Sequence, residues 1–399
     1  MPKNIVILLD GTSNAITHNR TNILRLYGVL KKDSEQIVYY DPGVGTFGAD
    51  SAWSGWWRKA HELWGLMTGW GLDQNVKEAY RFLVDHYDNG KKIGSKTGGS
   101  RRDRIYIFGF SRGAYTARVL AGFIHAVGLM EARNLNLLDY AYKAYKRVGE
   151  FDKPHATADE REAAFAEVRL FERMLKTDRP PIRMLGLFDT VASVIESGRY
   201  GPRLKSHAFT EKNESVQSVS HAVALDERRT MFRPLLWQQG GEYWGNPFNR
   251  KATRPQDVKE LWFAGYHGDV GGGLSEKESE LCKVPLLWMI ERARQCGLTF
   301  NTRSINLVVN GEGGEAKYVA PNALADRHDS MKVGWRLLEF FPRKKPKDSR
   351  RRSVFGLTLP LFEPRHVPDD AAIHASIDAR KKALNIWPRN IPIKHRFEE

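Results

Sequence analysis

The chain has 399 residues, 41% hydrophobic and 11% aromatic, a composition typical of globular rather than disordered or fibrous proteins. Its 62 basic and 47 acidic residues give a formal net charge of +15, which favours anionic partners such as phospholipid surfaces, nucleic acid or an acidic protein. The sequence contains no membrane-spanning apolar run, and we expect synthesis in the cytoplasm without a signal peptide. The two cysteines, Cys282 and Cys296, lack metal-ligand spacing, and we expect neither a metal ion nor a cofactor.

Short runs rich in valine, isoleucine and leucine alternate with stretches of helical periodicity along the chain. Such runs suit strands buried on both faces, and the alternation predicts an α/β-hydrolase-like fold, a mostly parallel sheet with helices on both faces. In such sheets reactive residues gather at the carboxyl ends of the strands. The expected strands lie in residues 4–12, 36–45, 104–111, 182–191, 218–227 and 260–273, and the expected helices in 72–87, 112–129 and 159–175.

Two segments depart from this alternation. Residues 46–71 hold five tryptophans and five glycines, and we interpret them as a lid-like insertion in a catalytic domain spanning residues 1–330. Residues 341–356 carry seven basic residues and one acid, within a basic C-terminal extension, 331–399, expected to pack on that domain. Tryptophan favours the lipid headgroup boundary and clustered basic residues favour anionic surfaces, so we expect peripheral contact with an anionic membrane. Alternatively, the tryptophans pack beneath a loop and the basic segment is solvated.

A serine lies between a predicted strand and a predicted helix. Gly109, Ser111 and Gly113 form the pattern G-x-S-x-G, whose small residues permit the sharp turn that exposes a nucleophilic hydroxyl. The N-terminus of the following helix favours developing negative charge. We interpret Ser111 as a nucleophile; the alternative is a glycine–serine turn that caps the helix.

A serine nucleophile needs a histidine base and an orienting carboxylate, which follow in the order Ser, acid, His in hydrolases with this turn. Asp189 and Asp226 both end downstream strands, and we prefer Asp189 because a lone acid after an apolar strand needs a partner. His267, at the end of the last expected strand and before a glycine-rich loop, is the expected base, with His221 as the alternative. Asp269 is a further candidate for orienting the histidine, or for binding a cation.

An oxyanion hole requires backbone N–H donors near the nucleophile. We expect one from Arg112 and a second from Gly11 or Thr12, in the loop after the first strand, with Asp10 and Asn14 shaping that loop. The alternative is that this loop is simply a helix cap and turn.

Several of these segments resemble one bacterial protein family. The stretches "DGTSN", "GFSRGAYTAR", "GLFDTV", "HAVALDERR" and "WFAGYHGDVGGG" are similar to a family of α/β-hydrolase domains that includes the class-one type VI secretion lipase effectors. The resemblance implies a serine hydrolase that acts on phospholipid esters in at least some members. It places Ser111, Asp189 and His267 at the nucleophile, acid and histidine positions. It also implies export by a type VI system and a secretion-apparatus or immunity protein as partner.

We therefore expect a serine esterase or lipase that cleaves carboxylic esters, with lipid acyl esters as substrates, through an acyl-enzyme. The alternative is an anion- or nucleic-acid-binding protein on a hydrolase-like scaffold without catalysis. The charge favours that alternative, but the sequence carries no helix-turn-helix, zinc or RNA-binding signature, and we expect no nucleic-acid partner. A catalytically inactive partner protein is a third interpretation, and the Ser, Asp and His set argues against it.

Overall fold

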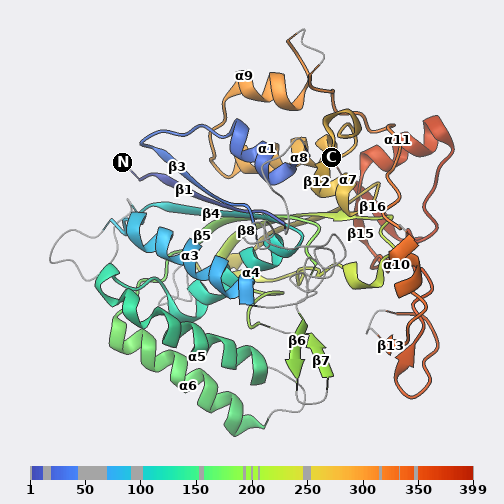
Figure 1. Cartoon of the computed structure of the whole chain (residues 1–399). Coiled ribbons are helices and arrows are strands. Elements are labelled where there is room, and N and C mark those ends of the chain that lie inside the picture. The colour runs from blue at the N-terminus through green and yellow to red at the C-terminus, as the bar shows by residue number, and fades with distance from the viewer. Residues whose placement is uncertain are drawn as a thin grey trace, which may run out of the picture.

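Eight parallel strands form a single sheet in the computed structural model of the chain (Figure 1). From one edge to the other these strands are β16 (His395–Glu398), β15 (Ala371–His374), β11 (Asp257–Phe263), β8 (Val216–Ala224), β5 (Ile182–Phe188), β4 (Arg104–Phe110), β1 (Asn4–Leu9) and β3 (Gln36–Asp41). The structure describes residues 2–11, 19–43, 70–90, 102–151, 157–191, 195–198, 201–204, 207–245, 253–313, 317–331, 333–345 and 349–398.

Helices cover both faces of this sheet (Figure 1). One face carries α3 (Trp70–His86), α4 (Arg112–Val127), α5 (Leu138–Phe151) and α6 (Ala158–Leu175), and the other carries α1 (Asn22–Val29) and α8 (Lys283–Gln295). The remaining helices are α7 (His267–Gly271), α9 (Thr302–Ser304), α10 (Val333–Leu338) and α11 (Ala375–Leu384). The fold is therefore the expected α/β-hydrolase-like one, and the expected helices 72–87, 112–129 and 159–175 correspond to α3, α4 and α6.

Short strands pair outside the main sheet. These are β2 (Arg20–Thr21) with β12 (Gly272–Leu274), β6 (Ile195–Gly198) with β7 (Gly201–Leu204), β9 (Glu242–Tyr243) with β10 (Arg254–Pro255), and β13 (Arg343–Lys344) with β14 (Leu357–Thr358). Single turns of tighter or wider helix cover Ala132–Leu137, Thr230–Phe232, Glu276–Glu278 and Ile305–Val309.

The first strand illustrates why the sheet is buried on both faces. Every residue of its sequence NIVILL is buried, and alternate side chains point to opposite faces. Ile5, Ile7 and Leu9 belong to the core beneath α3–α6, whereas Val6 and Leu8 belong to the core beneath α1 and α8. An uninterrupted apolar run is what a parallel strand between two helical layers requires.

The segment after residue 330 extends the sheet by two strands that the sequence did not suggest. β15 pairs with β11, and β16 pairs with β15. Buried Val367, Ile373 and Ile377 from this segment pack with Trp262 of β11. The division of the chain at residue 330 remains a prediction.

The structure bears on the absence of a membrane-spanning helix but not on the lid-like insertion. Among the helices in the described part of the chain, none is long and apolar enough to cross a membrane. The expected lid-like insertion, 46–71, lies outside the described residues except for its last two, which begin α3.

Candidate active site

Ser111 occupies the sharp turn between β4 and α4. Its backbone angles, φ 58° and ψ −121°, lie in a region that residues other than glycine rarely adopt. The flanking glycines are required by close packing: a Cβ on Gly109 would lie 2.4 Å from the carbonyl oxygen of Gly113, and one on Gly113 would lie 2.2 Å from that of Leu9. The G-x-S-x-G pattern therefore folds into a strained turn that presents the serine above the strand ends.

Three predicted site residues lie in hydrogen-bonding contact. The Oγ atom of Ser111 is 2.8 Å from Nε2 of His267, and Nδ1 of the same ring is 2.5 Å from Oδ2 of Asp189. Because β4, β5, β8 and β11 are parallel neighbours, their carboxyl ends share one edge of the sheet. Ser111 follows β4 and Asp189 follows β5. His267 was expected at the end of a strand, but β11 ends at Phe263, and the histidine instead begins α7.

The His267 imidazole is enclosed by aromatic side chains. Its ring centroid lies 4.7 Å from that of Phe110 and 5.0 Å from that of Phe232. Burial lowers the pKa of His267, although the hydrogen bond to ionised Asp189 opposes this effect. The ring is therefore neutral near pH 7, with Nδ1–H donating to the carboxylate and Nε2 free to accept the serine proton.

Asp189 is fully buried, and three donors hold its carboxylate in addition to His267. Arg365 contacts both carboxylate oxygens, Nη1 to Oδ1 at 2.6 Å and Nη2 to Oδ2 at 2.9 Å, and the backbone N–H of Ala224 donates to Oδ1 at 2.9 Å. Burial alone would raise the pKa of Asp189, but the Arg365 charge and the His267 hydrogen bond hold it well below its usual range. The sequence reasoning missed Arg365, which lies in the aperiodic stretch 363–368.

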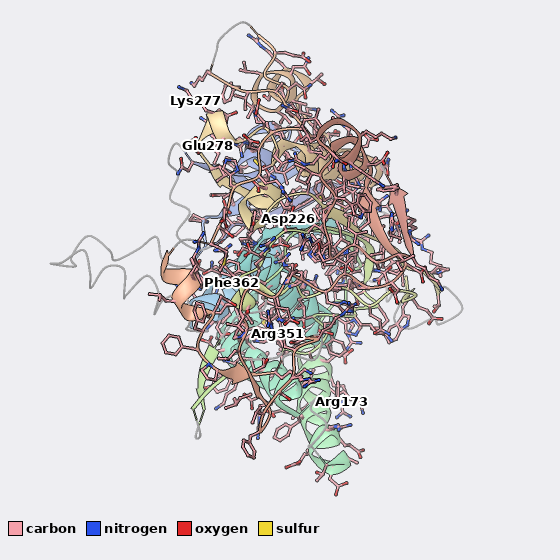
Figure 2. The ribbon with its side chains drawn as sticks, turned by 90° about the vertical axis from the view of Figure 1, so that its right-hand side faces the viewer. Arg173, Asp226, Lys277, Glu278, Arg351 and Phe362 are labelled. Atoms are coloured by element: carbon pink, nitrogen blue, oxygen red, sulfur yellow. The ribbon has the colours of Figure 1, made fainter. Side chains whose placement is uncertain are left out.

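The alternative acids bind other partners. Asp226, labelled in Figure 2, accepts hydrogen bonds from the backbone N–H of Gly265 and from Arg327, each at 2.7 Å. Asp269 accepts from His328, whose Nδ1 atom is 2.6 Å away. Both carboxylates therefore connect the start of α7 with the segment that contains Arg327 and His328. Neither has a hydrogen bond to the His267 ring among the interactions of the described residues.

His221 supports the loop that carries Asp189. Its Nδ1 atom is 2.8 Å from the Glu260 carboxylate, and its Nε2 atom accepts the backbone N–H of Thr190 at 3.2 Å. Burial lowers the pKa of this histidine, while Glu260 opposes the effect. Both ring nitrogens are thus engaged in holding the backbone next to the buried acid.

The structure describes two of the three expected oxyanion-hole donors, Gly11 and Arg112. The backbone N–H of Gly11 donates to Oδ1 of its neighbour Asp10 at 2.7 Å, so this donor already has an acceptor. A Cβ on Gly113 would lie 2.3 Å from the Asp10 carbonyl oxygen, which shows that the loop after β1 contacts the N-terminus of α4. The Arg112 backbone lies in the first turn of α4. Thr12 and Asn14 fall outside the described residues.

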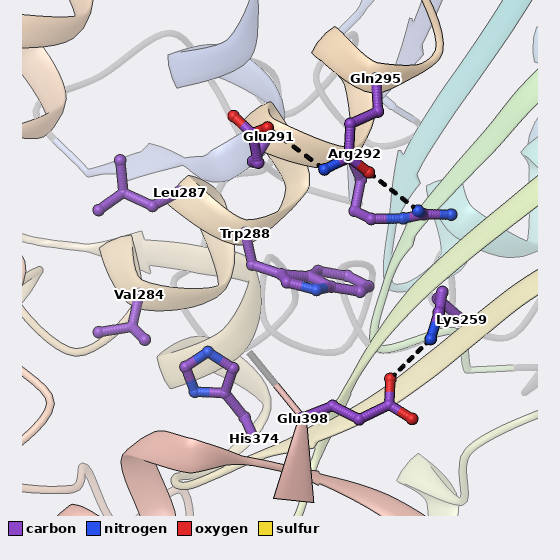
Figure 3. A pocket seen from close by; sticks show the side chains of 9 residues that line it. All are labelled: Lys259, Val284, Leu287, Trp288, Glu291, Arg292, Gln295, His374 and Glu398. Atoms are coloured by element: carbon purple, nitrogen blue, oxygen red, sulfur yellow. Dashed lines mark hydrogen bonds and ion pairs between the residues drawn. The ribbon is translucent and has the colours of Figure 1, made fainter.

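A separate pocket of about 570 Å³ lies between α8 and the strands β11, β15 and β16 (Figure 3). Trp288, His374, Lys259 and Glu398 line it, and Lys259 pairs with Glu398 at 2.9 Å. None of the three hydrogen-bonded site residues lines this pocket. Across the described residues, no group of three or more histidine, cysteine or acidic side chains is arranged to hold a metal ion.

The parallel sheet and the serine at its strand-to-helix turn define a protein of the α/β-hydrolase class. Residues 3–292 match the family model described as "T6SS, Phospholipase effector Tle1-like, catalytic domain". The chain belongs to this family, which confirms the resemblance noted in its motifs.

Individual relatives are similar over part of their length. The uncharacterized protein YEL023C of Saccharomyces cerevisiae is 36% identical over 243 residues, which are 59% of this chain and 33% of that protein. An uncharacterized protein from Pseudomonas aeruginosa, known from a crystal structure, is 20% identical with a TM-score of 0.43, over 75% of this chain and 46% of that one. The Tle1 effector bound to the VgrG spike of the type VI secretion system is 18% identical with a TM-score of 0.31, over 70% and 52%. The chain thus spans between a third and about half of the length of these relatives.

Proposed function

We propose that this chain is a serine esterase that cleaves the carboxylic ester bonds of phospholipids. The observation that carries the proposal is the continuous hydrogen-bonded line from the Ser111 hydroxyl through His267 to Asp189. The family description, a phospholipase effector catalytic domain, indicates the class of substrate. The strained turn at Ser111 and the neutral, enclosed imidazole supply the nucleophile and the base that ester cleavage requires.

In the proposed reaction, Ser111 Oγ attacks the ester carbonyl carbon and its proton passes to Nε2 of His267. Asp189 stabilises the imidazolium, which then protonates the leaving alcohol as the carbon–oxygen bond of the ester breaks. Water, deprotonated by the same histidine, then attacks the acyl carbon. The bond to Ser111 Oγ breaks, the imidazolium returns its proton to Oγ, and the fatty acid leaves. For the oxyanion we propose the backbone N–H of Arg112 and, once it leaves the Asp10 carboxylate, that of Gly11.

Peripheral contact with an anionic membrane is part of the proposal. The segment 333–363 reaches the site, because Phe232 contacts both the His267 ring and that of Trp335. Figure 2 shows the face on which Arg351 and Phe362 of this segment lie. Its exposed apolar side chains, which we call the 337–359 surface, are Leu337, Phe340, Phe341, Val354, Phe355, Leu357 and Leu359. Apolar side chains interspersed with arginine and lysine are suited to a lipid headgroup layer.

We further propose export by a type VI system, with a component of the secretion apparatus or an immunity protein as partner. This part rests on the family description alone. Pull-down of the chain with the spike proteins of its own organism would test it, and no retention by any of them would contradict it.

A fluorophosphonate probe and a panel of phospholipid and soluble esters test the catalytic proposal. Wild type should be labelled and active, whereas Ser111→Ala should escape labelling, and it and His267→Ala should lose at least about 10³-fold in activity. Ser304→Ala, which changes a serine of α9, is the matched control and should retain both properties. Labelling that survives Ser111→Ala would overturn the assignment. A folded wild type that is neither labelled nor active would favour the binding-protein alternative.

A further inference from the structure

Arg365 comes from a part of the chain that the family model does not match. The match ends at residue 292, yet Arg365 is only 4% exposed and lies against the buried carboxylate of Asp189. The remaining guanidinium hydrogen bonds go to backbone carbonyls, from Nη1 to Ala224 at 2.7 Å and from Nη2 to Phe232. One side chain therefore connects the ends of β5 and β8 with the residue whose ring contacts His267.

The surrounding chain fixes Arg365 in this place. Asn390 donates through Nδ2 to the Arg365 carbonyl oxygen at 3.2 Å and to that of Leu225 at 3.0 Å. Val367, two residues further on, is buried in the same core as Trp262. The guanidinium thus has little freedom to move away from the carboxylate.

The pairing is of the two-pronged kind that fixes orientation as well as charge. A carboxylate turns easily about its last torsion, because terminal torsions of this type have broad energy wells. The N–H of Ala224 restrains only Oδ1, whereas Oδ2 accepts from both His267 and Arg365. Two parallel N–H···O bonds hold the carboxylate plane. The lone pair that receives the His267 Nδ1–H is thereby kept in position.

The same pairing sets the charge that the imidazole experiences. Without a cation beside it, the buried Asp189 carboxylate would raise the proton affinity of His267. With Arg365 in place, that carboxylate is largely neutralised, so the imidazole gives up its proton at lower pH. The other charged groups that act on the imidazole are Glu227 and Arg229, after β8. Asp269 lies two residues after His267 on α7, and Arg112 follows Ser111 on α4.

We propose that Arg365 is a positioning residue for Asp189, so that the C-terminal segment completes the active site. The inference rests on the proposed serine esterase function. It assigns to the segment after residue 330 a part in the reaction, in addition to its packing on the sheet.

Steady-state kinetics on a soluble ester such as p-nitrophenyl butyrate, from pH 5 to 9, test this role. Arg365→Ala should lower kcat by about 10²-fold, the cost of a misplaced catalytic group, with KM within about twofold because Arg365 does not face the substrate. The acid limb of kcat/KM should move up by about one pH unit as Asp189 loses its counter-charge. Arg365→Lys keeps the charge without the two-pronged geometry, so its acid limb should match wild type while kcat stays reduced.

Arg380→Gln is the matched control. This buried arginine of α11 also donates to backbone carbonyls, those of Ala323 and Ala325 at 2.6 and 2.7 Å, but does not contact Asp189. Its kinetics should resemble wild type. If Arg365→Ala and Arg380→Gln lowered kcat equally and neither shifted the acid limb, Arg365 would have only a packing role. That result would overturn the proposal.

Two further observations separate the possible failures. If circular dichroism shows that Arg365→Ala does not fold, Arg365→Lys decides: a reduced kcat with the wild-type acid limb supports positioning, and an unchanged kcat overturns it. Fluorophosphonate labelling of wild type tests the esterase function independently. A labelled wild type with an unaffected Arg365→Ala would refute only the positioning role, whereas an unlabelled wild type would refute the function beneath it.

Discussion

Buried ionisable side chains in the site occur as pairs of opposite charge. Asp189 lies against Arg365, and Glu227, which is 1% exposed, contacts Arg229 at 2.8 Å. An isolated buried charge would be neutralised by a shift of its own pKa. Pairing keeps both carboxylates ionised in an environment from which water is largely excluded.

The pH dependence of catalysis should reflect the enclosed imidazole. The proposed mechanism needs neutral His267, and burial lowers the pKa of this group. The acid limb of kcat/KM should therefore fall below the ordinary histidine value of about 6.5. Hydrolysis of a soluble ester from pH 4.5 to 8 measures this. Asp189→Asn should lower kcat by about 10⁴-fold through loss of the orienting acceptor. An acid limb centred above pH 7 would contradict the prediction.

Glu227 should link stability to pH. Burial would raise its pKa, but Arg229 and backbone donors lower it from 4.5 to about 2. A depressed folded-state pKa contributes stability that is complete above about pH 4.5 and lost as pH falls towards 2. Urea unfolding of wild type and Glu227→Gln should therefore show a difference that narrows by about 1.4 kcal/mol between pH 7 and pH 3.5. A difference that stays constant with pH would contradict this linkage.

At the scale of secondary structure, predictability follows the length and burial of each segment. β1 could be recognised because strands buried on both faces read as nearly unbroken apolar runs. β15 and β16 could not, because AAIH and HRFE are four residues long and partly polar, and take their structure from strand neighbours distant in sequence.

The candidate site likewise contains residues that could be predicted from the sequence and contacts that could not. Ser111, Asp189 and His267 lie at or near strand ends and carry recognisable sequence contexts, so their convergence could be predicted, while their catalytic roles remain predictions. Arg365 follows no periodic pattern, and its contact spans 176 residues. The hydrogen bond between Gly11 and Asp10 depends on one side-chain rotamer, which a sequence does not show.

The turn between β4 and α4 should tolerate no side chain at its second glycine. Gly113→Ala would bring a Cβ to 2.2 Å from the Leu9 carbonyl oxygen, so α4 must move away from β1. We expect a destabilisation of roughly 2–4 kcal/mol and loss of most activity. Gly28→Ala in α1 is the matched control. Nothing lies within 4 Å of a Cβ at this position, so the substitution should raise the free energy of unfolding by roughly 0.5–1 kcal/mol. Chemical unfolding and esterase assays measure both, and a neutral Gly113→Ala would contradict the packing.

At the scale of the whole molecule, we propose that the net charge of +15 and the 337–359 surface act on the same partner, an anionic bilayer. Long-range attraction brings a cationic protein to an anionic bilayer, and apolar side chains then hold it there. Phe355 is fully exposed, as is Ile393, which lies outside that surface. Substituting each of these residues therefore distinguishes the effect of lying in the 337–359 surface from the effect of exposure alone.

Co-sedimentation with vesicles of anionic and of zwitterionic lipid should separate the two effects. Wild type should bind the anionic vesicles better, and added salt should weaken that binding. Phe355→Ser should reduce it about tenfold, because burying a phenylalanine contributes roughly 1.5–3 kcal/mol, whereas Ile393→Ser should not. Equal binding of all three proteins to both vesicle types would contradict membrane contact through this surface.

The ion pair between Asp189 and Arg365 also has a consequence for biosynthesis. The two residues are 176 positions apart, and ribosomes add about 5–20 residues per second while earlier parts of the chain begin to fold. Each new molecule therefore spends roughly 9–35 s with the aspartate already made and its cation not yet translated. The serine is present throughout that interval and the histidine joins it partway, 78 residues after the aspartate, but the acid lacks the cation that we propose orients it. We therefore expect the active site to be completed only late in the synthesis of the chain.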